Sequence, residues 1–150
     1  MSLQKQIMDA MIIAMKAKDT VALDALRAVK SAIILAQTEG GAKGEISEGD
    51  EIKLLQRLVK QRNDSAAIYS QQGRDDLVQP EIEQAEIIKQ FLPEQLNEEE
   101  VAKVVDEIIA QTGASSMKDM GRVMGMTNSK IAGKADGKTI STIVKARLSS

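Results

Sequence analysis

The side chains best suited to chemistry are cations spaced along a glycine-containing stretch near the end of the chain. The candidate nucleic-acid-binding residues are Arg122, Lys130, Gly133, Lys134 and Lys138. A helix is predicted to begin after Asp136, so the lysines surround a helix N-terminus. Free main-chain N–H groups, the helix dipole and nearby lysines together suit a phosphate group, and glycine lets a nucleic-acid backbone approach closely. The alternative left open is that Asp136 caps those donors and the lysines are only solvated.

The charge of the chain is divided unevenly along its length. Residues 116–150 hold seven basic and two acidic residues, a formal charge of +5. The whole chain carries −2, so residues 1–115 must carry −7. Such an asymmetry is typical of a protein whose basic part meets a polyanion while the acidic part orients the molecule.

A second polar group lies in the middle of the chain and consists of Arg62, Tyr69, Arg74 and Glu83. Arg62 falls on the apolar stripe of a predicted helix, so its charge needs a partner. Glu83 or Glu86 on the next helix is the expected partner. We interpret this group as a structural ion pair, with a binding role as the alternative.

Composition argues against an enzyme. The chain has no Cys and no His, which removes the thiolate nucleophile, the usual general base and the usual zinc ligands. No spacing marks a P-loop, a dinucleotide turn or a carboxylate cluster for a metal. We therefore predict no catalytic residues, no metal and no cofactor, and expect that the chain is not an enzyme on its own. Ser–Lys catalysis is the alternative left open, although no spacing marks such a pair.

Hydrophobic periodicity predicts an all-α fold with no strands. Residues 1–92 are predicted to form an N-terminal helical hairpin or bundle of about four helices, and residues 97–150 a small, basic C-terminal domain of three helices. Pro93 and the new cap at Asn97 place the boundary at 93–96. No run is long and apolar enough to span a membrane, and we expect a cytosolic protein.

Capping and breaking residues predict the helix ends. The first helix runs over 3–17 with Ser2 as its cap, and the second begins after Asp19 and ends at Gly40–Gly41. A flexible connection over 41–46 follows. The third helix runs from Ser47 to about Gln72, where Gly73 stops it.

The remaining helices are predicted in the same way. The fourth starts at Asp75 or Gln79, with Pro80 tolerable only in its first turn. Its buried side is expected to comprise Ile82, Ala85, Ile88 and Leu92. The fifth runs from Asn97 to Gly113. A short helix capped by Ser116 extends to Met126, a loop covers 127–135, and the last helix follows Asp136.

We expect the glycines and methionines of the short helix to serve in packing. Gly121 and Gly125 are four residues apart, a spacing that lets two helices pack closely, and room for a sugar-phosphate backbone is the alternative. Met117, Met120 and Met124 follow the helical period and are expected to fill the core.

Four segments together carry a family resemblance. They are LRAVKSAI (26–33), QRNDSAAIYSQQGRDDL (61–77), QFLPEQL (90–96) and DMGRVMG with GKADGKTIS (119–125 and 133–141). The chain resembles the YqeY-like family, free-standing bacterial proteins built around the GatB/YqeY domain. The LPEQL and GKADG segments are the most specific.

The resemblance implies a function that the residues alone do not. The same domain forms the C-terminal tail of the GatB subunit of the glutamine-dependent aspartyl/glutamyl-tRNA amidotransferase, where it grips tRNA. It implies a tRNA-binding, amidotransferase-related module that lacks the catalytic domain of that carbon–nitrogen ligase. Expected partners are tRNA or other structured RNA, and an amidotransferase or another translation-related protein. With one Tyr and one Phe, recognition by shape suits the chain better than base stacking. The competing hypothesis is a protein–protein adaptor.

Overall fold

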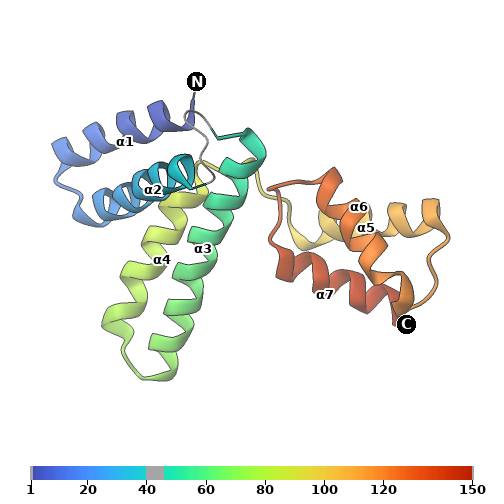
Figure 1. Ribbon diagram of the computed structural model, residues 1–150. Coiled ribbons are helices and arrows are strands. Elements are labelled where there is room, and N and C mark those ends of the chain that lie inside the picture. The colour runs from blue at the N-terminus through green and yellow to red at the C-terminus, as the bar shows by residue number, and fades with distance from the viewer. Residues whose placement is uncertain (1, 40–45, 150) are drawn as a thin grey trace. The chain divides into compact units, whose positions relative to one another are not determined.

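The computed structural model describes residues 2–39 and 46–149, and these residues contain helices and no strands (Figure 1). The prediction of an all-α protein is confirmed. The helices are α1 Leu3–Ala17, α2 Thr20–Thr38, α3 Glu48–Gln71, α4 Asp75–Lys89, α5 Glu98–Thr112, the short 3-10 helix η1 Met117–Asp119, α6 Met120–Lys130 and α7 Gly137–Leu148. The chain divides into two compact units, Met1–Leu92 and Pro93–Ser150, each with its own apolar core.

In the first unit, α1 and α2 pair as a hairpin, α3 and α4 pair as another, and α2 packs against both α3 and α4 (Figure 1). The turn between α1 and α2 is short because Lys18 takes a left-handed conformation (φ +57) and Asp19 at once caps α2. The Asp19 carboxylate accepts a 3.0 Å hydrogen bond from the Ala22 N–H. The expected end of this helix at Gly40–Gly41 and the connection after it involve residues 40–45, which lie outside the described residues; Glu39 is the C-cap.

Caps predicted from sequence fix the starts of α1 and α3. The hydroxyl of Ser2 accepts from the Lys5 N–H at 3.2 Å, and that of Ser47 from the Asp50 N–H at 3.1 Å. The core residues of the unit come from α1, α2, α3 and α4. They are Leu3, Ile7, Ala14, Ala25, Leu26, Val29, Ile33, Leu54, Leu55, Leu58, Val59, Ala85 and Ile88.

Helix α4 corrects two expectations. It starts at Asp75, so Pro80 lies in the second turn and not the first. Proline removes the N–H that would bond the Asp76 carbonyl, and the cost is tolerated because both residues are exposed to water. The expectation that Ile82 is buried is wrong: it is exposed, because six residues of helix turn it about 120° away from the buried Ile88.

The second unit packs α5, α6 and α7 against one another. A capping box starts α5: the Asn97 side chain accepts from the Glu100 N–H at 2.8 Å, and the Glu100 carboxylate accepts from the Asn97 N–H at 3.2 Å. Gly113, with φ +69, ends it as predicted. Asp136 caps α7 by accepting from the Thr139 N–H at 2.7 Å.

Helix α6 is longer than predicted. It continues to Lys130 instead of ending at Met126, so the loop covers 131–136 and not 127–135. Thr127, which looked like a loop residue, is fully buried, and its hydroxyl donates a 2.8 Å hydrogen bond to the Val123 carbonyl one turn earlier. The core role predicted for Met117 is wrong, because this side chain is 42% exposed. Met120 and Met124 are partly buried against the core.

Candidate nucleic-acid interface

Two buried residues anchor the loop between α6 and α7. Ile131 and Ala135 are buried in the core of the second unit, whereas Lys134 between them is exposed. Gly133 is buried with φ +78, a backbone conformation that favours glycine. The sequence Gly-Lys-Ala-Asp-Gly therefore turns the chain sharply and leaves one lysine pointing away from the core. We call residues 130–138 the lysine loop.

A second segment fixes the main chain of the lysine loop. The N–H of Leu96 donates a 2.8 Å hydrogen bond to the carbonyl of Lys134. The side-chain amide of Gln95 donates to the carbonyl of Gly133 at 2.7 Å, and also to that of Pro93 at 2.7 Å. These bonds join the LPEQL segment to the GKADG segment, so the lysine loop is a fixed part of the unit.

Carboxylates pair with some of the candidate cations. Lys130 lies 3.1 Å from Glu107 on α5, and Arg122 donates to Asp119 at 3.5 Å and to the Thr112 carbonyl at 3.4 Å. Such exposed pairs are weak, so these cations remain available to a phosphate at a modest cost.

Lys134 and Lys138 differ from those two. Both side chains are exposed, and among the described residues no carboxylate lies within ion-pair distance of either. The same holds for Lys118 and Lys145. The predicted set of cations therefore divides into a partly neutralised pair, Lys130 and Arg122, and the two unneutralised lysines 134 and 138.

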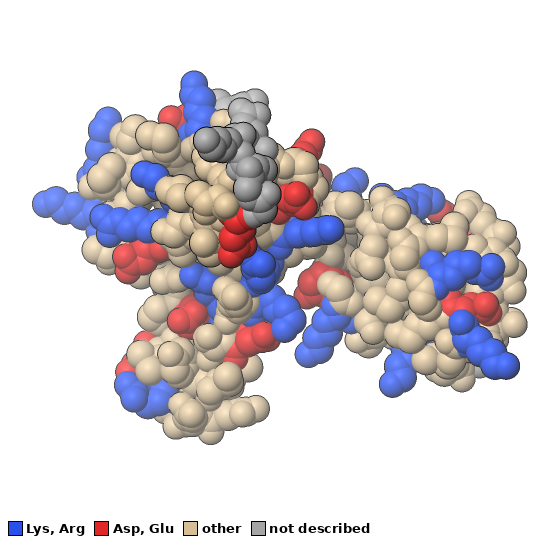
Figure 2. Space-filling view, viewed as in Figure 1, with Lys and Arg blue, Asp and Glu red and all other residues tan. Residues whose placement is uncertain are grey.

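The formal charge of the whole second unit is zero, since residues 93–150 hold eight basic and eight acidic residues. Residues 93–115, in and before α5, hold six of the acids and one base, Lys103, and their charge of −5 balances the +5 of residues 116–150. Figure 2 shows basic side chains of this unit spread over the drawn face, with acidic ones between them. The expectation of a basic domain is thus corrected: the excess of positive charge belongs to the α6–α7 part alone.

One face of α6 is bare. Gly121 and Gly125 are exposed, and a Cβ atom added at either would meet no atom within 4 Å. The expectation that they let two helices pack closely within the unit is therefore wrong. Glycine in a helix interior costs about 0.5–1 kcal/mol relative to alanine, and no packing within the unit offsets that cost.

The start of the η1–α6 segment is fixed by a carboxylate. Asp119 accepts hydrogen bonds from the N–H groups of Ser115 (3.0 Å) and Ser116 (3.4 Å). These bonds, more than the nearby Arg122 charge, hold the pKa of Asp119 below its usual range. Asp119 is therefore ionised at neutral pH, and it orients Arg122.

The second polar group predicted from sequence is not one cluster. Arg62 donates to the Gln84 side chain at 3.4 Å and to the Leu58 carbonyl at 3.3 Å. Neither Glu83 nor Glu86 lies within ion-pair distance of it in the described part of the chain, so the expected ion pair is wrong. Gln84 lies on the α4 face toward α3, whereas Glu83 and Glu86 are exposed.

Arg74 and Tyr69 belong to the α3–α4 turn. Arg74 binds Asp76 through two hydrogen bonds of 3.0 and 3.1 Å, which lower the pKa of Asp76 and raise that of Arg74. The Arg74 N–H also donates to the Tyr69 carbonyl at 2.8 Å. These contacts stabilise a turn that Tyr69 and Arg74 share, whereas Arg62 lies against Gln84 and Glu83 is exposed.

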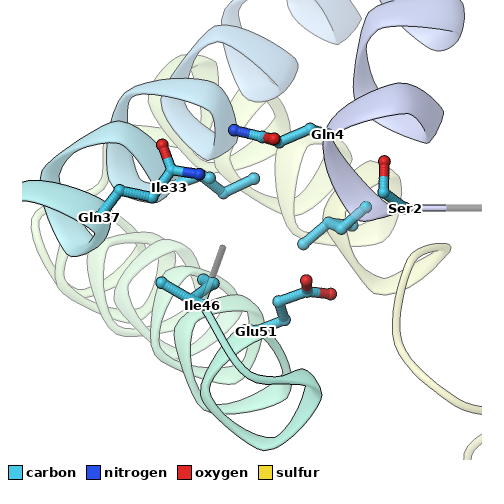
Figure 3. A pocket seen from close by; sticks show the side chains of 7 residues that line it. Ser2, Gln4, Ile33, Gln37, Ile46 and Glu51 are labelled. Carbon is cyan, nitrogen blue, oxygen red and sulfur yellow. The ribbon is translucent and has the colours of Figure 1, made fainter. Parts of the chain in front are cut away.

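One hollow of the first unit is too small for a metabolite. Figure 3 shows this hollow of about 40 Å³, lined from α1, α2 and α3 by residues that include Gln4, Gln37 and Glu51. Its volume suits water more than a small-molecule substrate. Within residues 2–39 and 46–149, no group of three acidic side chains could hold a metal ion.

The chain matches the model of the family described as Yqey-like protein over residues 4–148. The chain belongs to this family. The LPEQL and GKADG segments that suggested the family are the same two segments that hydrogen bonds join in the second unit.

Curated relatives extend this result. The chain is 39% identical over 79 residues to "Altered inheritance of mitochondria protein 41, mitochondrial" of Clavispora lusitaniae, covering 53% of this chain and 45% of the relative. It is 37% identical over 79 residues to the protein of the same name from Meyerozyma guilliermondii, covering 53% and 40%. It is 28% identical over 126 residues to the E-type subunit of glutamyl-tRNA(Gln) amidotransferase of Thermococcus gammatolerans, covering 79% and 20%.

The chain thus spans less than half the length of each of these relatives. The amidotransferase relative is of the E type, whereas the sequence motifs suggested the tail of the GatB type. The fungal relatives are named mitochondrial, so the expectation of a cytosolic protein stays a prediction. No described helix is long and apolar enough to cross a membrane.

Sequence reasoning missed the residues that organise the interface. Gln95 and Leu96 were noted only as part of a family motif, and Glu107 and Asp106 were not singled out. Asp106 pairs with Arg147 at 2.9 Å. A signal was available for Glu107 and Asp106 alone: they are acids on the exposed side of an amphipathic helix in a unit with a basic end.

Proposed function

We propose that the chain binds structured RNA, with tRNA as the expected class, through the lysine loop and the bare face of α6, and that it catalyses no reaction itself. The observation that carries this proposal is the placement of Lys134 and Lys138. They are cations without carboxylate partners among the described residues, and the main chain beside Lys134 is hydrogen-bonded to Leu96. The main chain at Lys134 is already ordered by this bond, so less backbone freedom is lost when the lysine meets a phosphate.

The bare face of α6 supports the same proposal. Gly121 and Gly125 leave room for a sugar-phosphate backbone to come close to the helix. Arg122 follows Gly121 directly and extends from an exposed position. This surface would recognise an RNA by its phosphates and shape, and it needs no aromatic side chains to stack on bases.

The relation to one subunit of an amidotransferase gives the proposal its context. That relative is named for glutamyl-tRNA(Gln), and the chain covers only 20% of it. We infer that the chain acts as an RNA-docking module beside an amidotransferase or another protein of translation.

Charge reversal tests this function. Lys134→Glu combined with Lys138→Glu should weaken the binding of unfractionated tRNA in a filter-binding assay at least about tenfold, because two phosphate contacts become repulsive. Lys103→Glu, an equal change per site at an exposed position on α5, should change affinity less than about twofold. Equal losses of tRNA affinity in the double variant and in Lys103→Glu would contradict a localised interface.

A protein–protein adaptor is the second candidate function. The observation that favours it lies in the other unit, where α1 and α2 expose large apolar side chains.

A further inference from the structure

The α1–α2 hairpin exposes more large apolar side chains than the fold explains. Met8, Ile12 and Met15 recur at helical spacing on α1, and all three are exposed, as is Ile34 on α2. Another face of α1 is already used, because Leu3 and Ile7 are in the core. Helix α1 is therefore apolar on two faces, and one of them has no cover in its own unit.

A hollow lies between the two helices on that side. It has a volume of about 210 Å³ and is lined by Gln4, Ile7, Met8, Lys30, Ile33 and Ile34. This volume suits one or two large apolar side chains. The lining contains one charged residue, Lys30, which is exposed and has no carboxylate within ion-pair distance among the described residues.

The charges that α1 and α2 place beside this surface are mainly positive. Lys5 precedes Met8 by one turn, and Lys16 follows Ile12 by one turn, and both are exposed without an ion pair in the described part of the chain. Asp9 is the one carboxylate within α1. On α2, Asp24 is already paired with Arg27 at 3.8 Å.

We propose that this α1–α2 surface, formed by Met8, Ile12, Met15, Lys30 and Ile34, binds one acidic amphipathic helix of a protein partner. An apolar side chain of that helix fills the hollow, and its neighbours lie on the exposed methionines and isoleucines, as in other helix-in-groove complexes. Its carboxylates face Lys5, Lys16 and Lys30, which sets the sign of the partner's charge.

Two other occupants fit less well. A second copy of the chain in a two-fold dimer would place the same cationic rim against itself, so like charges would repel. A flat anionic bilayer would attract the lysines but would leave the hollow unfilled. The proposal is independent of RNA binding, since every residue in it belongs to the first unit.

A pair of designed peptides tests the proposal. The first has about 18 residues of Glu, Ala and Leu, with Leu on one helical face over about five turns; the second has Lys in place of every Glu. Fluorescence anisotropy with the full chain should detect binding of the acidic peptide and a much weaker signal from the basic one. Absence of acidic-peptide binding, or preference for the basic peptide, would overturn the proposal.

Matched variants locate the binding. Ile34→Ser should weaken binding of the acidic peptide about tenfold, the loss expected for a central apolar contact. The control Ile68→Ser should change it less than about twofold, because Ile68 is similarly exposed (53% against 48%) but lies on α3. Lys30→Glu should weaken binding about fivefold, whereas Lys53→Glu, at an exposed position on α3, should have little effect.

Other occupants give other results. Circular dichroism should show each variant folded, so that a loss of binding is not a loss of structure. Binding to vesicles containing phosphatidylserine that Ile34→Ser abolishes, without acidic-peptide binding, would assign the surface to a membrane and overturn the proposal. A concentration-dependent dimer in sedimentation that Ile34→Ser dissociates would assign it to a second copy, with the same consequence.

Discussion

The main-chain N–H of Leu96 donates a 2.8 Å hydrogen bond to the carbonyl oxygen of Lys134, across 38 residues of sequence. This bond joins the segment at the start of the second unit to the loop before its last helix. It fixes the main chain from which the Lys134 side chain extends into solvent. Two short motifs far apart in sequence are thus one structural feature, and the proposed RNA interface depends on it.

The left-handed turn at Gly133 gives the first prediction. Gly133→Ala should lower the free energy of unfolding of the second unit by about 1–2 kcal/mol, because an L side chain is disfavoured at φ +78. The exchange rates of the α5 and α7 amide hydrogens measure this loss. Aromatic fluorescence would not report on the second unit, because Tyr69 and Phe91 both belong to the first unit. The control Gly137→Ala, where an added Cβ meets nothing within 4 Å, should not destabilise. Similar losses in both variants would show that the turn at Gly133 is not the cause.

The bare face of α6 gives a prediction in which stability and binding change in opposite directions. Gly125→Ala should stabilise the second unit by about 0.5–1 kcal/mol, because alanine favours a helix interior and meets no neighbour. Gly121→Ala, in the first turn of α6, should stabilise it by less. The double variant should nevertheless bind tRNA more weakly, because its methyl groups keep the RNA backbone away from the helix. Thermal unfolding and filter binding on the same preparations test both parts. Unchanged affinity in a stabilised protein would remove α6 from the interface.

Asp119 gives a prediction on pH. Hydrogen bonds from Ser115 and Ser116 lower its pKa in the folded protein, so the folded state favours the ionised carboxylate. Its stabilising contribution is present above the ordinary pKa of about 4 and is lost as pH falls through the lower folded value. Asp119→Asn should therefore be less stable than wild type at pH 7, and the difference should shrink toward pH 3 in urea titrations. A difference that stays constant with pH would show that ionisation of Asp119 does not matter.

Local signals in the sequence predicted the fold well. Ser2, Asp19, Ser47, Asn97 and Asp136 were each predicted as caps, and each accepts the expected main-chain hydrogen bond. A cap depends only on residues within one turn, so it can be inferred from adjacent residues. The same local rules caused the errors at Thr127 and Pro80, since both residues have a poor preference for helix. Burial of Thr127 offsets this cost in α6, and exposure of Pro80 to water offsets it in α4.

The candidate site was less predictable because it depends on contacts between distant segments. The cations were found by their type and spacing, but which of them remain unneutralised depends on α5, where Glu107 meets Lys130. Gly121 and Gly125 have the spacing of a helix–helix contact. The sequence alone could not show that this face of α6 is left uncovered by the other helices of the unit. The predicted partner of Arg62 was wrong for the same reason: the residue of α4 that accepts its hydrogen bond is Gln84.

The salt dependence of tRNA binding tests the central claim most directly. Unfractionated tRNA should bind the full chain at low ionic strength, and log Kobs should fall with log salt concentration with a slope of about −3 to −4, as expected for about four phosphate contacts. Lys134→Glu with Lys138→Glu should make the slope shallower by about two. Absence of binding at low ionic strength, or an affinity that does not change with salt, would contradict the proposed RNA-binding function.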